Sequence, residues 1–225
     1  MNRARGAHAI VDAFAHRFMP ATDPESRLAL LLLHGTGGNE DDLLPLGAML
    51  APGAARLSPR GQVLENGMPR FFRRLAEGVF DLEDLERRTH QLADWVKAAV
   101  AAYALADRAL VAVGFSNGAN VGAAMLLLRP ESLAGAVLLR ATLPLEPREL
   151  PSLAGRPVLI ASGRGDPFVA PADAERLVAT LTRAGAEVTH RWSDAGHELG
   201  AGELNVAREW LASRNWSPVP GAREP

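Results

Sequence analysis

The stretch ALVAVGFSNGANVGAAMLLL, residues 109–128, decides the fold of this chain. Its first part, Ala109–Val113, is continuously apolar and therefore predicts a strand buried on both faces. Its last part, Asn117–Leu128, is rich in alanine and predicts a helix. Between them, Gly114-Phe115-Ser116-Asn117-Gly118 matches G-x-S-x-G, the pattern of a serine held in a sharp strand-to-helix turn. A chance glycine-rich turn is the alternative, but the flanking strand and helix favour Ser116 as a nucleophile.

Apolar runs and amphipathic segments alternate along the rest of the chain. Strands are predicted at 28–33, 134–139 and 157–161, with weaker ones at 187–192, 55–57 and, as an edge strand or hairpin arm, 13–19. Helices are predicted at 82–106, 171–184 and 199–213. This alternation predicts an α/β fold with a mainly parallel sheet covered by helices on both faces. In such sheets, sites form at the carboxyl ends of the strands.

Composition excludes several classes of protein. The 225 residues are 48% hydrophobic and 22% charged, with a net charge of −2, so no excess charge points to nucleic acid. The absence of cysteine excludes disulfides, thiolate metal sites and a cysteine nucleophile. The longest apolar run, Leu28–Leu33, falls far short of the ~20 residues that span a bilayer. The first residues do not match a secretory signal, so a cytoplasmic location is expected.

One α/β domain is expected over residues 1–216. Residues 217–225 hold few groups to bury and are predicted to be a disordered tail.

A glycine-rich loop follows the run Leu28–Leu33. In His34-Gly35-Thr36-Gly37-Gly38, glycines allow the backbone to approach the neighbouring serine turn. The amides of Thr36 and Asn117 are therefore the expected oxyanion hole. His34 is expected to brace the loop. The alternative, a phosphate-binding turn, lacks the G-x-x-x-x-G-K-[ST] pattern.

Two further candidates follow later strands. Asp166, in Gly163-Arg164-Gly165-Asp166-Pro167, is placed to orient an imidazole, although Asp is also common at helix N-caps and in turns. His197 is the one histidine in a loop after the last predicted strand. The order Ser116, Asp166, His197 is the chain order of α/β-hydrolases and differs from that of the two large serine-protease folds.

The irregular segment 60–81 also begins at a strand end. Phe71 and Phe72 are candidates for the wall of an acyl pocket, and Arg60 or Arg70 for contact with a substrate carboxylate, with Arg70 preferred. The alternative is a packed loop whose arginines pair with Glu65, Glu77 and Asp81. Arg140, after the strand at 134–139, has the same two interpretations, with a structural role favoured.

Taken together, these motifs resemble the phospholipase/carboxylesterase family of α/β-hydrolases, and in particular its bacterial carboxylesterases. The resemblance runs from about Leu28 to Leu211, and its landmarks are the loops at 33–38, 114–120, 165–167 and 196–197. It implies a three-layer α/β-hydrolase fold without a large lid, and hydrolysis of small acyl substrates with no cofactor and no metal. Acyl-protein thioesterases commonly carry Gln where this chain has Asn117, which disfavours palmitoyl-protein substrates.

The leading hypothesis is a serine carboxylesterase that hydrolyses small soluble esters through an acyl-enzyme. An acyl thioesterase or lysophospholipase-like hydrolase is the alternative within enzymes. A non-catalytic binding protein of the same fold is the alternative of another class. The expected partner is a small-molecule ester, with no nucleic acid and no membrane, and the chain is expected to be a monomer or homodimer.

Overall fold

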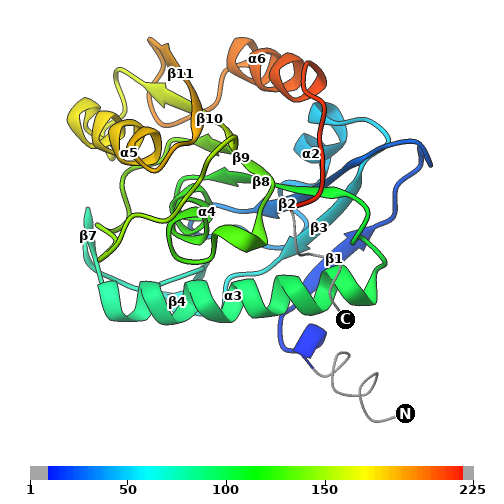
Figure 1. The fold of residues 1–225 in the computed structure, drawn as a ribbon. Coiled ribbons are helices and arrows are strands. Elements are labelled where there is room, and N and C mark those ends of the chain that lie inside the picture. Colours follow the sequence, from blue (N-terminus) through cyan, green and yellow to red (C-terminus); the bar gives the residue numbers. More distant parts are fainter. Residues whose placement is uncertain (1–9, 220–225) are drawn as a thin grey trace.

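A computed structural model describes residues 10–219 of the chain. Its centre is a seven-stranded sheet in the order β1-β3-β2-β8-β9-β10-β11 (Figure 1). The strands of this sheet are β1 (His16–Met19), β2 (Leu28–Leu33), β3 (Ala55–Pro59), β8 (Ala109–Phe115), β9 (Gly135–Leu139), β10 (Pro157–Gly163) and β11 (Glu187–Ser193). Neighbouring strands are parallel except β1, which pairs antiparallel with β3. The predicted mainly parallel α/β sheet is confirmed.

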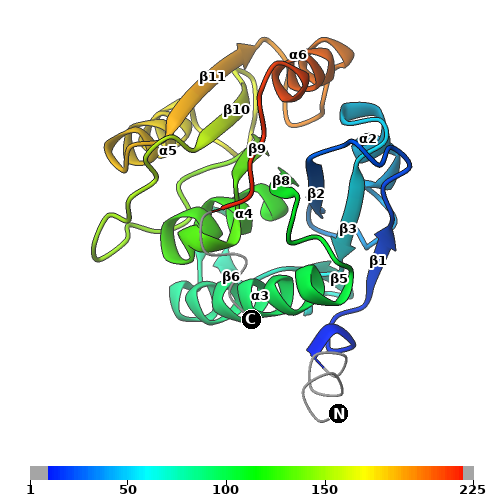
Figure 2. The same cartoon turned by 45° about the vertical axis from the view of Figure 1, so that its right-hand side comes forward.

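Helices cover both faces of the sheet, as Figures 1 and 2 show from two directions. The helices are α2 (Leu44–Leu50), α3 (Leu82–Ala102), α4 (Asn117–Leu128), α5 (Pro171–Arg183) and α6 (Ala201–Ala212), with a short 3-10 turn η1 (Pro130–Ser132). Side chains of α3, α4 and α5 belong to one hydrophobic core, and those of α2 and α6 to the other. These two helical layers and the sheet between them make the predicted three layers.

Strand β2 explains why a continuous apolar run is needed. Leu31 and Leu33 face the core under α3 and α4, whereas Leu30 and Leu32 face the core under α2 and α6. All four leucines are fully buried. Because side chains alternate along a strand, a sheet covered on both faces requires apolar residues at every position.

The segment 60–81 differs from the irregular loop that the sequence suggested. It forms two short antiparallel hairpins, β4 (Val63–Glu65) with β5 (Met68–Arg70), and β6 (Arg74–Ala76) with β7 (Val79–Phe80). The first hairpin turns at Asn66 and Gly67, which have φ of 51° and 81°. Asn-Gly is a strong signal for a two-residue hairpin turn, so this pair was readable from the sequence.

Other boundaries shift modestly. Helix α3 ends at Ala102 rather than at 106, and Ala104 beyond it has a φ of 53°, which a helix cannot accommodate. Helix α2 was not predicted. Residues 1–9 and 220–225 lie outside the described part, and with them most of the predicted tail at 217–225.

Among residues 10–219, no helix combines the length and the apolar character needed to cross a membrane.

Candidate active site

Ser116 lies at the carboxyl end of β8 in a strained turn. Its φ is 52° and its ψ is −115°, a backbone conformation that costs about 1–3 kcal/mol for a residue with a side chain. Its amide donates to Leu139 O at 2.9 Å, which ties the turn to β9. Ser116 is also the N-cap of α4, so it lies where β8 ends and the helix begins.

Two glycines allow this turn to pack closely. A Cβ added to Gly118 would lie 2.0 Å from the carbonyl oxygen of Leu33, and one added to Gly114 would lie 2.6 Å from Ala119 Cα. Both distances are far inside atomic contact with backbone, which cannot move aside. The glycines of the G-x-S-x-G motif are therefore required by the approach of α4 to β2 and to its own strand.

The structure brings together the three side chains that the sequence singled out. His197 Nε2 lies 2.9 Å from Ser116 Oγ, and His197 Nδ1 lies 2.8 Å from Asp166 Oδ2. The Asp166 side chain is fully buried, whereas that of His197 is 21% exposed. The arrangement is that of a hydroxyl whose proton an imidazole can take, with a carboxylate to orient that imidazole.

Asp166 is fixed by backbone donors as well. Its Oδ1 accepts from Phe168 N at 2.8 Å and from Val169 N at 3.2 Å, which leaves Oδ2 for the imidazole. The His197 ring lies between two aromatic rings, with Phe115 at 5.1 Å and Phe168 at 4.9 Å between centroids. These contacts limit rotation of the imidazole away from Ser116. Phe168 was not singled out from the sequence.

Thr36 and Asn117, whose amides are the expected oxyanion donors, line the same cavity as Ser116 and His197. Within residues 10–219, neither amide donates a hydrogen bond to another group of the chain. Asn117 is the first residue of α4, where amides have no partner inside the helix. Two free donors next to a hydroxyl can receive an oxyanion.

His34 braces the loop that carries Thr36, as expected. Gly61 N donates to His34 Nε2 at 2.9 Å, so the ring proton is on Nδ1, which lies 2.7 Å from Gly35 O. Burial lowers the pKa of His34, which keeps the ring neutral in this role. The loop is also held by Gly37 N, which donates to Pro69 O at 2.9 Å.

Phe71 and Phe72 do not line the cavity, and this corrects the expectation for the two rings. Phe72 is fully buried in the core and meets Phe80 edge-on at 5.1 Å, while the Phe71 ring packs on His34. Phe80 takes the place at the cavity wall. The backbone of Phe71 still contributes, because its amide donates to Asn117 Oδ1 at 2.8 Å.

Arg70 does line the cavity. Its Nη1 donates to Thr36 Oγ1 at 2.6 Å and its Nε to Phe72 O at 3.2 Å, while Glu65 lies 3.5 Å from Nε. Burial lowers the pKa of Arg70, and the neighbouring Arg74 lowers it further. Arg74 takes both oxygens of Glu65 at 2.7–3.1 Å, so Arg70 shares that carboxylate with a closer partner.

The other arginines of the segment pair with acids as the alternative interpretation expected. Arg74 also bonds Glu77, and Arg73 meets Asp81 at 2.5 Å. Hydrogen bonds from Arg74, despite some burial, lower the pKa of Glu65. Arg70 faces the cavity, and its nearest carboxylate, Glu65 at 3.5 Å, is held more closely by Arg74.

The cavity beside Ser116 has a volume of about 340 Å³. Its wall combines apolar groups with charged ones of both signs. Besides Thr36, Arg70, Phe80, Phe115, Ser116, Asn117, Phe168 and His197, it is lined by Arg74, Glu77, Gly78, Asn120, Arg140, Thr142, Val169 and Asp173. This size and this mixture suit a small organic molecule with a polar group. In the part of the chain that is described, no three His, Asp or Glu side chains gather to hold a metal ion.

Comparison with known proteins gives the family. No protein-family model matches the chain. The chain is 48% identical over 181 residues to "Putative hydrolase MhqD" of Bacillus subtilis (strain 168), which covers 80% of this chain and 90% of that protein. The crystal structure of the Bacillus cereus carboxylesterase is 47% identical, covers 88% of this chain and 93% of that one, and has a TM-score of 0.85. This chain belongs to the phospholipase/carboxylesterase family of α/β-hydrolases.

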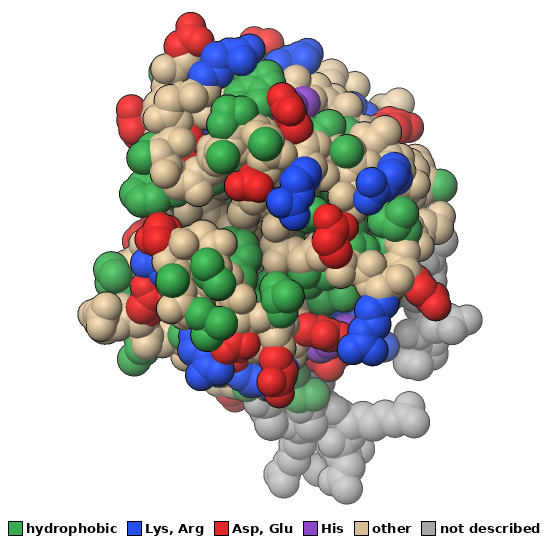
Figure 3. Space-filling model, turned by 90° about the vertical axis from the view of Figure 1, so that its left-hand side faces the viewer, with side chains coloured by type: hydrophobic (Ala, Val, Ile, Leu, Met, Phe, Trp, Pro, Cys, Tyr) green, Lys and Arg blue, Asp and Glu red, His purple; other side chains and the backbone are tan. Residues whose placement is uncertain are grey.

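A less similar solved structure is that of YahD with malic acid. It is 28% identical, with a TM-score of 0.84, and covers 90% of this chain and 100% of that one. The family resemblance and the α/β-hydrolase fold predicted from the motifs are confirmed, and these relatives support a hydrolase of the ester type. Figure 3 adds that basic and acidic side chains are interspersed on the face it shows, with scattered apolar groups between them.

Proposed function

We propose that this member of the family is a serine carboxylesterase that acts on small soluble esters through an acyl-enzyme. Ser116 Oγ attacks the carbonyl carbon while His197 Nε2 takes its proton. The amides of Thr36 and Asn117 receive the oxyanion. The intermediate collapses, the alcohol leaves with the proton from His197, and Ser116 is acylated. Water then attacks the acyl group, His197 takes a proton from it, and the carboxylic acid leaves.

One observation carries this proposal. Hydrogen bonds of 2.9 Å and 2.8 Å link Ser116 Oγ, His197 and the buried Asp166 carboxylate. The same cavity is lined by Thr36 and Asn117, whose amides donate to no other group within residues 10–219. A binding protein of the same fold has no need for a strained serine hydrogen-bonded in this way. The geometry thus favours the enzyme over the non-catalytic alternative.

The test is covalent labelling followed by turnover. A fluorophosphonate probe reacts with a serine only when it is activated, so we expect labelling of the wild-type chain at Ser116 and none in Ser116→Ala. An ester series and a matched thioester series of increasing acyl length then separate the carboxylesterase from the thioesterase. Absence of labelling in folded wild-type protein would contradict the proposal.

We further propose that Arg70 recognises an anionic group on the substrate. The guanidinium is only 4% exposed, lines the cavity and donates to Thr36 and to a carbonyl, both neutral acceptors. Its nearest carboxylate, Glu65, is more tightly held by Arg74. A substrate carboxylate would supply a counter-charge closer than Glu65, and arginine suits such groups. Malic acid, with which YahD was solved, is a dicarboxylic acid and fits this preference.

A further inference from the structure

Arg140 is sealed inside the protein at the carboxyl end of β9. Its side chain has no exposed surface, and it is among the largest fully buried side chains of the described chain. Its φ is 59°, so each of the two adjacent strands β8 and β9 is followed directly by a residue with positive φ, Ser116 and Arg140. A buried cation in a strained backbone conformation is costly unless its partners fix both.

The Arg140 guanidinium hydrogen-bonds the backbone on both sides of His197. Arg140 Nε donates to Gly196 O at 2.8 Å, and Nη2 donates to Glu198 O at 2.6 Å. These carbonyls belong to the residues immediately before and after the histidine. One rigid, planar group therefore fixes the path of the backbone through His197.

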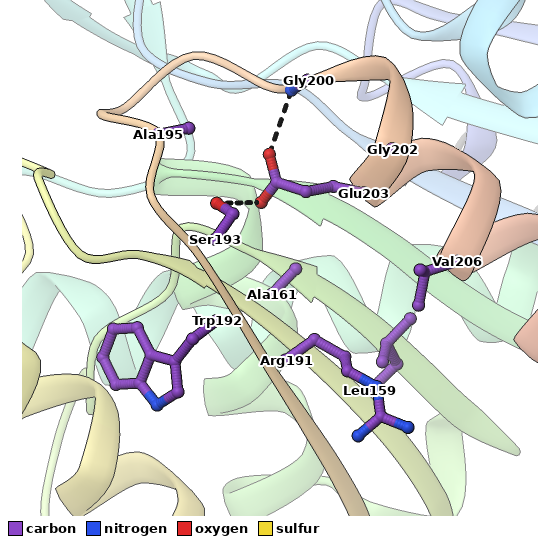
Figure 4. Close-up of a pocket in the computed structure, with 10 residues that line it drawn as sticks. All are labelled: Leu159, Ala161, Arg191, Trp192, Ser193, Ala195, Gly200, Gly202, Glu203 and Val206. Carbon is purple, nitrogen blue, oxygen red and sulfur yellow. Dashed lines mark hydrogen bonds between the residues drawn. The ribbon is translucent and has the colours of Figure 1, made fainter.

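The charge of Arg140 is met by Glu203 on the first turn of α6. Nη1 lies 2.6 Å from Glu203 Oε1, and Nη2 lies 2.8 Å from Oε2. The same carboxylate accepts from Ser193 Oγ and from Gly200 N, each at 3.0 Å, as Figure 4 shows. Glu203 thus holds both ends of the loop 193–200, and Arg140 holds its middle.

The protonation of this pair is set by its contacts. Burial alone would raise the pKa of Glu203, but hydrogen bonds from Arg140 and Gly200, together with the charge of Arg140, bring the pKa below its ordinary value. Glu203 is therefore ionised at neutral pH. The pair does more than neutralise charge, because each of its members also bonds the loop that carries His197.

Arg140 also lies next to the acid of the site. Its Nε is 3.9 Å from Asp166 Oδ2, the oxygen that bonds His197, and neither side chain has exposed surface. Charges at this distance interact strongly when water is excluded. Other charged groups at the cavity wall are Arg70, Arg74, Glu77 and Asp173.

We propose that Arg140 is a positioning residue for His197, with Glu203 as its counter-ion. Arg140 sets the position of the imidazole through the two flanking carbonyls, and its charge balances that of Asp166. A role in packing alone would not need these contacts, since well-packed apolar residues replace many buried ion pairs without loss of stability. This inference rests on the proposed role of His197 as base.

The test separates geometry from charge with three variants. Arg140→Lys keeps the charge but cannot reach both carbonyls, so kcat should fall about 100-fold with KM within about threefold, and the pH profile should keep its acid limb. Arg140→Met loses the charge too, which favours the imidazolium, so the acid limb of kcat/KM should move to higher pH. Glu203→Gln removes a negative charge, so the limb should move to lower pH.

Asp194→Asn is the matched control, because Asp194 is in the same loop but its side chain is 99% exposed. It should leave kcat and the pH profile unchanged. Circular dichroism checks folding; if Arg140→Met does not fold, Arg140→Lys and Glu203→Gln decide. Near-wild-type kcat in Arg140→Lys, or limbs that fail to move in opposite directions, overturn the positioning role. The proposed function fails separately, if Ser116→Ala keeps its turnover.

Discussion

The two sides of the candidate site are held in place by different means. On the Ser116 side, the backbone fixes the position of the serine. The positive φ of Ser116, the two glycines and the close approach of α4 to β2 determine where its side chain lies. On the His197 side, side chains fix the position of the histidine, because Asp166, Arg140 and Glu203 hydrogen-bond the irregular loop that carries it. A backbone solution leaves a local sequence signature. A side-chain solution depends on residues such as Arg140 and Glu203, which lie far apart in the chain.

The largest effect on turnover is expected from loss of the Ser116 hydroxyl. Ser116→Ala should lower ester turnover by about 10⁴-fold or more, because members of such a group act as a unit. The protein should stay folded, since alanine keeps the Cβ and the hydroxyl that is lost bonds the part-exposed His197. Steady-state kinetics with a nitrophenyl ester measures the loss, and circular dichroism checks the fold. Wild-type turnover in the purified variant would remove Ser116 from the mechanism.

A second substitution tests whether that side is set by its backbone. Gly118→Ala puts a Cβ about 2.0 Å from Leu33 O, so the free energy of unfolding should fall by about 3 kcal/mol. Activity should fall with it as the turn shifts. Gly122→Ala on the same helix is the matched control, because its nearest contacts are side chains at 3.4 Å. Urea denaturation of both variants decides; equal stabilities would show that the approach to β2 is not tight.

A third substitution tests whether the His197 side is set by its side chains. The pKa of Glu203 is lowered in the folded protein, so its contribution to stability is present above the ordinary carboxyl range and is lost as pH falls through the lowered pKa. Glu203→Gln should therefore lower the free energy of unfolding by about 2 kcal/mol at neutral pH. The wild type and the variant should converge as the pH falls from the ordinary carboxyl range through the lowered pKa of Glu203.

Urea denaturation at several pH values measures this difference, with Asp194→Asn as the exposed control. A difference that grows as the pH falls would contradict the assignment of Glu203 as an ionised partner.

The smallest effect is expected at Arg70, which lines the cavity away from the Ser116 and His197 sides and is proposed to contact the substrate. Arg70→Met should raise KM for a carboxylate-bearing ester, such as monomethyl succinate, about tenfold more than for a neutral ester of equal length. Arg73→Met is the matched control, because Arg73 is 63% exposed and pairs with Asp81. If Arg70→Met weakens both esters equally, Arg70 serves the loop through Thr36 and not the substrate.

The sequence predicted features that depend on the backbone better than features that depend on side-chain contacts. The strands of the central sheet and the loops that carry Ser116, Asp166 and His197 were readable, because apolar runs and glycines record what the backbone needs. The oxyanion role of the Thr36 and Asn117 amides stays a prediction. The rings of Phe71 and Phe72 were misplaced, because the direction of a side chain in segment 60–81 is set by packing on His34 and Phe80. Phe168 and Glu203 gave no local signal. Arg140 was singled out by its place after a strand, with a structural role favoured, but nothing in the sequence linked it to His197. The Asn66-Gly67 turn did give one.

The distance along the chain between the partners at the site has a consequence for folding. Ser116 and His197 are 81 residues apart in sequence, and strands β9, β10 and β11 must all pair in order before their side chains can meet. Contacts so distant in sequence form late, because the chain loses the entropy of a long loop before the contact can stabilise it. Refolding chains should therefore recover their helical signal well before they recover esterase activity. Activity then reports completion of the sheet, so an enzyme assay doubles as a probe of the last folding step.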